Sequence, residues 1–323
     1  MLNILTHYTR RFLDSYRDTI RVISHFNLIK LNGKKIIFKI AFIRFVYSFS
    51  FIRNLQKTIY KNKKMITHFF KDKDIDLFND IKQVDEKGYS KIFTIKDSLK
   101  EELLKIVFNC KELDVKKLDL SSPEIFKKSF ETIDQYVTRL KKKNISKITG
   151  YIDLKTSSAL KDFLTSEEIL SFVKNYLNTN EISINASFFI SNPVTTSERQ
   201  KLSNAQYFHW DNDFKKFLKL YIYLTDVGHE NGPHIYVEES HKFKKFEHRL
   251  SRPYPDSSIY SSYSKIKEFT GKSGSSFFVD SYGLHKGKVP EKNSRILLNI
   301  HFGSGKILYS GNDIHMKINN SLK

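Results

Sequence analysis

Two residue types that bind metals stand two positions apart in this sequence, at His209 and Asp211. On an extended strand the side chains alternate between two faces, so both ligands would point to one side and Trp210 to the other. A further histidine, His285, lies far downstream in a strand-like context, and Arg295 follows ten residues later. Two histidines and one carboxylate leave coordination positions open, which is typical of non-haem Fe(II) sites that use dioxygen.

The secondary structure that must position these residues is predicted to change along the chain from helices to strands. Spacings typical of helix starts predict helices over 98–109, from Ser122-Pro123 to about 143, and after Thr165, where Glu168 completes a capping box. Period-two alternation predicts strands over 182–190, 218–224, 235–237, 275–279 and 295–302, after a first short strand at 88–93. Helices followed by many strands predict an α+β domain with helices flanking a β-sandwich or jelly roll.

Composition limits the class of protein. The chain has 323 residues, of which 40% are hydrophobic, so it can bury a large core. Its single cysteine, Cys110, excludes an intramolecular disulfide and favours a reducing compartment, so we expect a cytoplasmic protein. The sequence contains neither a G-x-S-x-G nucleophile elbow nor a dinucleotide or phosphate-binding fingerprint, which disfavours hydrolase and nucleotide-binding functions.

The positive charge is concentrated at the N-terminus. Residues 1–70 carry 14 Lys or Arg and two acids, Asp14 and Asp18, so they account for +12 of the net charge of +20. We therefore predict a basic helical N-terminal extension over 1–79 and a main domain over 80–323. The basic, aromatic residues 1–70 would suit a packed helical extension or peripheral contact with an anionic membrane surface. This distribution disfavours nucleic-acid binding, which would predict strongly salt-dependent affinity.

A longer series of motifs surrounds the potential ligands in a fixed order. In chain order these are His209-X-Asp211, Leu224-Thr225-Asp226-Val227, Asn231-Gly232-Pro233, Ser240-His241-Lys242, Gly274 ahead of an apolar strand, His285 and Arg295. In this order and spacing, residues 80–305 resemble the phytanoyl-CoA dioxygenase family of Fe(II)- and 2-oxoglutarate-dependent oxygenases. The resemblance implies a double-stranded β-helix, which is a variety of jelly roll, flanked by helices.

The resemblance also implies roles for the metal-binding residues. It implies that His209, Asp211 and His285 are the catalytic Fe(II) ligands, leaving positions for 2-oxoglutarate and dioxygen. Since halogenase variants of this fold lack the acid, Asp211 favours hydroxylation with decarboxylation of 2-oxoglutarate to succinate.

The cosubstrate residues follow from the same resemblance. Arg295 matches the cation that grips the far carboxylate of 2-oxoglutarate with paired hydrogen bonds. Tyr221 matches a position that contacts the cosubstrate, and alternation along the last strand would put Asn299 on the side of Arg295. Gly287 stands where some relatives carry a hydroxyl side chain, so one hydrogen bond to the cosubstrate is missing or is supplied elsewhere.

Several features stay open at this stage. His229, His234, His241 and His248 fit no zinc spacing and are interpreted as structural or substrate-lining, with His234 at a position that relatives usually fill with an apolar residue. A catalytically silent binding or scaffold protein of the same fold remains an alternative. The expected substrate is a small molecule, a lipid or a glycan precursor, and the sequence does not indicate an oligomeric state.

Overall fold

The computed structural model describes residues 64–71, 74–110, 112–113, 131–213, 216–250, 253–305 and 314–317, together with short stretches between residues 9 and 49. Most of the predicted extension over 1–79 lies outside these residues, and so does the predicted helix start at Ser122-Pro123. Within the described ranges, no helix combines the length and the apolar character needed to cross a membrane.

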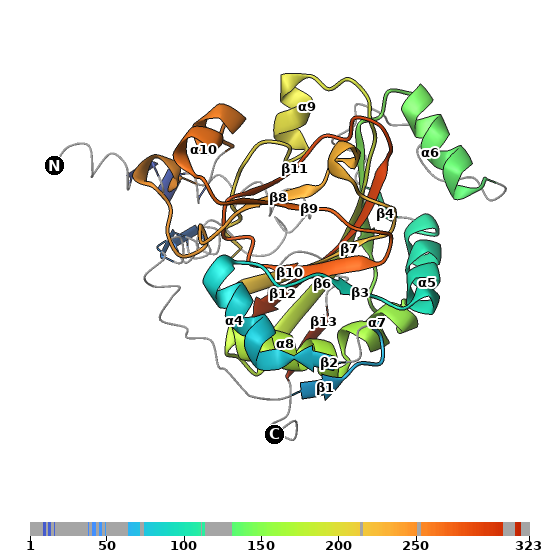
Figure 1. Ribbon diagram of the computed structural model, residues 1–323, viewed down its shortest axis with the longest axis horizontal. Coiled ribbons are helices and arrows are strands. Elements are labelled where there is room, and N and C mark those ends of the chain that lie inside the picture. Colours follow the sequence, from blue (N-terminus) through green and yellow to red (C-terminus); the bar gives the residue numbers. More distant parts are fainter. Residues whose placement is uncertain are drawn as a thin grey trace.

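A large antiparallel sheet forms the centre of the molecule (Figure 1). The predicted strands 182–190, 218–224, 275–279 and 295–302 all belong to it, with ends that differ by a residue or two. Its main path runs β3 (Phe93–Thr94), β10 (Ser275–Val279), β7 (Phe217–Tyr223), β12 (Arg295–Ser304), β6 (Glu181–Ser191), β5 (Lys147–Ile152) and β4 (Glu112–Leu113), and β13 (Ile314–Lys317) also pairs with β6.

A smaller antiparallel sheet faces the large one (Figure 1). It consists of β11 (His285–Gly287), β8 (His234–Val237) and β9 (Ile266–Phe269), in that order. An isolated bridge between His209 and His285 extends it by one further segment. The aromatic rings of Phe269 and Phe277 stack at 4.1 Å between the two sheets. A separate pair is formed by β1 (Lys64–Ile66) and β2 (Asp74–Asp76).

The helices pack outside the sheets. In Figure 1, α4, α7 and α8 lie below the large sheet and α9 and α10 lie above the small one. The helices are α4 (Leu77–Lys87), α5 (Asp97–Phe108), α6 (Ile133–Lys142), α7 (Ser158–Leu164), α8 (Glu167–Leu177), α9 (Glu198–Ser203) and α10 (Asp256–Ser262), with short 3-10 turns η3 (His229–Asn231) and η4 (Phe246–His248). The predicted mixture of helices and antiparallel sheet is therefore confirmed.

Two predicted helix starts differ from the observed ones by one residue. Helix α5 starts at Asp97, and its N-cap residue Lys96 makes no side-chain cap because an ammonium group cannot accept a hydrogen bond. The Lys96 amide instead donates to the carbonyl of Phe69. Helix α8 is capped by Ser166 rather than Thr165. The expected partner in that box, Glu168, is buried and accepts a hydrogen bond from the His68 amide. In both helices, tertiary contacts override the local capping pattern.

Alternation along the central strands separates an apolar face from a polar one. Ile296 and Leu298 of β12 belong to the core between the sheet and the helices. Arg295, Asn299 and His301 alternate with them and therefore point to the face that looks toward the small sheet. The space between the sheets thus receives polar side chains from the large sheet, as the alternation predicts.

Candidate metal centre

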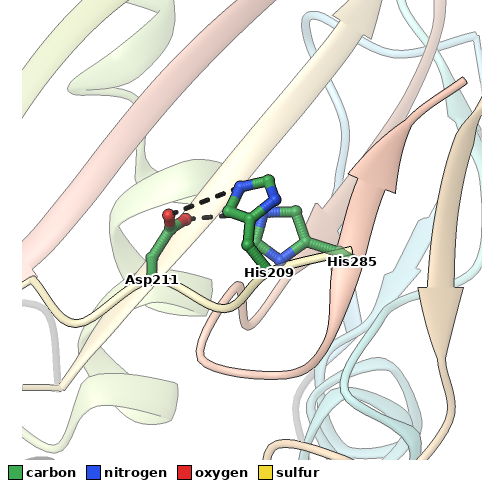
Figure 2. Close-up of side chains that lie close together, drawn as sticks. All are labelled: His209, Asp211 and His285. Carbon is green, nitrogen blue, oxygen red and sulfur yellow. Dashed lines mark ion pairs between the residues drawn. The ribbon is translucent and has the colours of Figure 1, made fainter. Parts of the chain in front are cut away.

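His209, Asp211 and His285 come together between the two sheets (Figure 2). One ligand atom from each residue lies within 4.8 Å of the other two, and among the described residues this is the one such group of three. The Asp211 carboxylate lies 3.9 Å from Nε2 of His209 and 3.6 Å from Nε2 of His285. The structure therefore brings the three predicted ligands into one cluster, whose donor atoms suit Fe(II).

Backbone contacts fix which imidazole nitrogens face the cluster. Nδ1 of His209 lies 2.9 Å from the carbonyl oxygen of Tyr207, and Nδ1 of His285 lies 2.9 Å from that of Gly283. A carbonyl oxygen only accepts, so each Nδ1 carries the proton and each Nε2 is the ring nitrogen that carries the lone pair. Such bonds orient histidine ligands before a metal arrives.

The turn that leads into β11 depends on a close approach at Gly283. The hydroxyl of Tyr236 donates to the carbonyl of Asp280 at 2.9 Å, and the Gly283 amide donates to the same carbonyl at 3.0 Å. A Cβ atom at Gly283 would lie 1.9 Å from the Tyr236 hydroxyl, so only glycine fits here. This turn sets the position of His285. The Asp211 amide bonds to Ser281 in the same turn, at 2.9 Å.

The opposite side of the His209 segment is apolar, as expected from alternation. Trp210 is buried in a cluster with Tyr282 and Leu284, behind the small sheet. Its indole nitrogen donates to the carbonyl oxygens of His248 and Leu250 at 3.1 and 2.9 Å. These contacts anchor the backbone on which His209 and Asp211 sit.

The sequence interpretation missed Lys219, which reaches the cluster from β7. Its ammonium group donates to Oδ2 of Asp211 at 2.5 Å. Burial alone would raise the pKa of Asp211, but the charge of the neighbouring Lys219 holds it well below its usual value. The available signal was a lysine inside the apolar run 218–224, on the same strand face as Tyr221.

Arg295 is buried with unused hydrogen-bonding capacity. Its Nη2 donates to Ser191 at a long 3.4 Å, whereas Nε and Nη1 have no partner among the described residues. A Cβ atom at Gly287 would lie 3.1 Å from Nη2, so the absent side chain leaves room for the guanidinium. Burial lowers the pKa of Arg295 below its ordinary value. A buried cation without a counter-charge is suited to bind an anion.

The other two predicted cosubstrate residues lie directly opposite each other. Asn299 on β12 pairs with Tyr221 on β7, and both are largely buried. The Asn299 amide nitrogen donates to Ser187 at 2.9 Å, while its Oδ1 is buried without a partner in the described part of the chain. The structure thus places both residues on the strand face that carries Arg295.

Of the four histidines interpreted from the sequence as structural or substrate-lining, three lie in ordinary structural surroundings. His229 is exposed and pairs with Glu268, and His241 contacts the carbonyl of Asp85 at 2.8 Å. The ring of His248 is held by Ser258 and Tyr263. The fourth, His234, differs because its ring centre lies 5.4 Å from that of His285.

The amino-acid sequence that forms this site matches the model of a known protein family. The model of the phytanoyl-CoA dioxygenase (PhyH) family matches residues 124–289, which are 166 of the 323 residues. The chain belongs to this family. All three candidate metal ligands lie inside the PhyH match, whereas Arg295 lies just beyond its end.

Solved structures similar to this PhyH chain are distant in sequence. HygX from Streptomyces hygroscopicus, with nickel and 2-oxoglutarate bound, is 12% identical with a TM-score of 0.48, over 70% of this chain and 86% of that chain. The non-heme alpha-ketoglutarate-dependent epimerase SnoN from nogalamycin biosynthesis is 12% identical with a TM-score of 0.46, over 73% and 86%. EctD from S. alaskensis with bound Fe is 12% identical with a TM-score of 0.45, over 72% and 79%. No curated protein matches the chain.

The buried His285 of this PhyH protein predicts acid sensitivity in the metal-free state. Burial, reinforced by His209, lowers the pKa of His285 from 6.5 to about 3. The unfolded chain therefore takes up the proton first as the pH falls below about 6.5. Between pH 6.5 and about 3, the contribution of His285 to the free energy of unfolding should decrease by about 1.4 kcal/mol for each unit by which the pH falls. Changes of pH above 6.5 should leave this contribution intact.

Urea unfolding of the metal-free protein at about pH 7 and about pH 5 measures this effect, with an expected loss from His285 of about 2 kcal/mol. The variant His285→Leu should lack this part of the loss, whereas His229→Leu, which removes an exposed histidine, should retain it. Equal acid sensitivity in wild type and His285→Leu would contradict the prediction.

Proposed function

We propose that this chain is an Fe(II)/2-oxoglutarate-dependent dioxygenase that hydroxylates an organic substrate. When bound, the metal would supply dioxygen activation coupled to decarboxylation of 2-oxoglutarate to succinate. The proposal includes a double-stranded β-helix over residues 80–323, built from the two facing sheets. The observation that carries it is a cluster of two histidines and one aspartate facing the same space between the sheets as a buried, incompletely bonded arginine.

The protein's own residues would hold the reactants in place. His209, Asp211 and His285 would bind Fe(II) through the Nε2 atoms of the two histidines and one carboxylate oxygen. Lys219 already occupies Oδ2 of Asp211, so the other oxygen is left for the metal. This contact orients the carboxylate and offsets its charge before metal binding.

The cosubstrate would lie along the polar face of the large sheet. Arg295 would bind the far carboxylate of 2-oxoglutarate through the unused Nε and Nη1 donors. Tyr221 and Asn299 would line the same site. The buried rings of Phe269 and Phe277 keep that part of the space between the sheets apolar, which strengthens charge interactions there.

The substrate would be a small molecule, a lipid or a glycan precursor in the cytoplasm. Residues 1–70, within the proposed extension over 1–79, would contact the membrane surface peripherally if the substrate is lipid-linked. The large positive charge of this segment supports that part of the proposal. The proposal would be contradicted if the full-length protein bound anionic vesicles no more strongly than neutral ones.

Anaerobic titration of the full-length protein with Fe(II), followed by 2-oxoglutarate, tests the central proposal. We expect metal-dependent binding of 2-oxoglutarate, and a catalytically silent scaffold would show none. Succinate release should then be screened with acyl-CoA, sugar-lipid and small-metabolite panels. Mass analysis must detect the gain of one oxygen atom in the product, because succinate release alone does not distinguish hydroxylation from other oxidations.

A further inference from the structure

His234 is a buried histidine at the inner surface of the small sheet. Only 3% of the residue is exposed, and its ring centre lies 4.8 Å from that of Tyr221 and 5.4 Å from that of His285. It therefore lies between a candidate metal ligand and a candidate cosubstrate residue. His234 is not one of the three candidate metal ligands.

Strand register places His234 beside the guanidinium of Arg295. His234 on β8 pairs directly with Gly287 on β11. Side chains at such paired positions start about 4.5–5.5 Å apart on the same face. At Gly287 the place of the missing side chain is taken by the guanidinium, whose Nη2 lies 3.1 Å from where a Cβ would be. The imidazole and the guanidinium are therefore neighbours.

Several nitrogen atoms of His234 and Arg295 have no hydrogen-bond partner among the described residues. Nε2 of His234 and both Nε and Nη1 of Arg295 are buried without a hydrogen-bond partner in the described residues. Leaving such groups unpaired destabilises the folded protein, and most buried polar groups in proteins are paired. Two neighbouring side chains whose nitrogens are unused within the described part of the chain are suited to bind an anion.

The charge state of His234 is compatible with this arrangement. Burial, reinforced by the charge of Arg295, holds the pKa of His234 well below 6.5. A neutral imidazole donates one N–H to an oxygen anion without repelling the adjacent guanidinium.

We propose that His234 binds the far carboxylate of 2-oxoglutarate together with Arg295, supplying the hydrogen bond that no side chain at Gly287 can make. This inference rests on the proposed function. It assigns His234 to positioning the cosubstrate and gives it no part in metal binding. Its effect therefore depends on whether the 2-oxo acid carries a far carboxylate.

The test compares two 2-oxo acids on anaerobic, Fe(II)-loaded, full-length protein by calorimetry. 2-Oxoglutarate has the far carboxylate and pyruvate lacks it. His234→Leu should raise the Kd for 2-oxoglutarate roughly 10- to 100-fold, which is the loss of one hydrogen bond to a charged group. It should leave the affinities for pyruvate and Fe(II) unchanged. His234→Gln keeps an N–H donor and should lose less.

The controls separate this inference from the proposed function. His229→Leu removes an exposed histidine and should bind both acids as wild type does. If wild type binds 2-oxoglutarate but His234→Leu binds it equally well, or loses both acids equally, the inference fails and the proposed function stands. If wild type binds no 2-oxoglutarate, the proposed function fails and the inference fails with it. His234→Gln provides the same comparison if the leucine variant does not fold.

Discussion

Asp211→Asn is expected to reduce Fe(II)-dependent turnover of 2-oxoglutarate to the background level. The substitution removes the one negative charge among the three clustered ligands and replaces an anionic oxygen with a weaker, neutral donor. Calorimetric titration with Fe(II) should show a corresponding loss of metal affinity. Turnover in this variant close to that of wild type would refute the assignment of Asp211 as a ligand.

Asparagine is preferred to alanine because Asp211 also forms a buried ion pair. Lys219 donates to it at 2.5 Å, with the two side chains only 13% and 20% exposed. Removing the partner of a buried charge costs roughly 3–5 kcal/mol, so Asp211→Ala should also lower the free energy of unfolding. Asparagine keeps an oxygen acceptor for the lysine. Comparison of the two variants by urea unfolding separates the loss of the metal from the loss of folding.

Asp226→Asn provides the matched control. This carboxylate follows the end of β7 and pairs with Lys272, but its side chain is 60% exposed. The same chemical change there should leave Fe(II) binding unaffected and should change stability by less than about 1 kcal/mol. A similar loss of turnover in Asp226→Asn would mean that the effect of Asp211→Asn is not specific to the metal centre.

The sequence was sufficient to predict the parts of the site that depend on alternation and motif order. Alternation placed His209 and Asp211 opposite Trp210, and it placed Asn299 on the side of Arg295. The structure has both arrangements. These inferences succeeded because strand side chains alternate regardless of what lies beyond the strand.

Features that depend on contacts between distant segments were not predictable. The ion pair between Lys219 and Asp211 requires the packing of β7 under the His209 segment, and His234 meets Gly287 only through strand register. The cap of α8 failed for the same reason, since Glu168 bonds to His68, 100 residues away in sequence. Local patterns specify which face a residue occupies, whereas the partner on that face depends on the tertiary fold.

Arg295→Leu is expected to raise the Kd for 2-oxoglutarate by at least about 100-fold while making the metal-free protein more stable. The loss of affinity follows from removing paired, charge-assisted hydrogen bonds to a carboxylate. The gain in stability follows because the guanidinium is buried with a single long bond, to Ser191, within the described part of the chain. A leucine there avoids the cost of burying an unpaired charge, and we expect a gain of about 1–3 kcal/mol in the free energy of unfolding.

Arg139→Leu is the control that should change stability in the opposite direction. Its guanidinium donates to both oxygens of Glu131, at 2.6 and 2.9 Å, so its removal takes two charge-assisted hydrogen bonds away from a mostly buried carboxylate. Urea unfolding should therefore show lower stability for Arg139→Leu and unchanged binding of 2-oxoglutarate. A structural arginine at 295 would behave like Arg139. Replacing an arginine that serves ligand binding should make the protein more stable and lower its affinity for the ligand. The reason is that the partner of such an arginine is the ligand rather than another part of the protein.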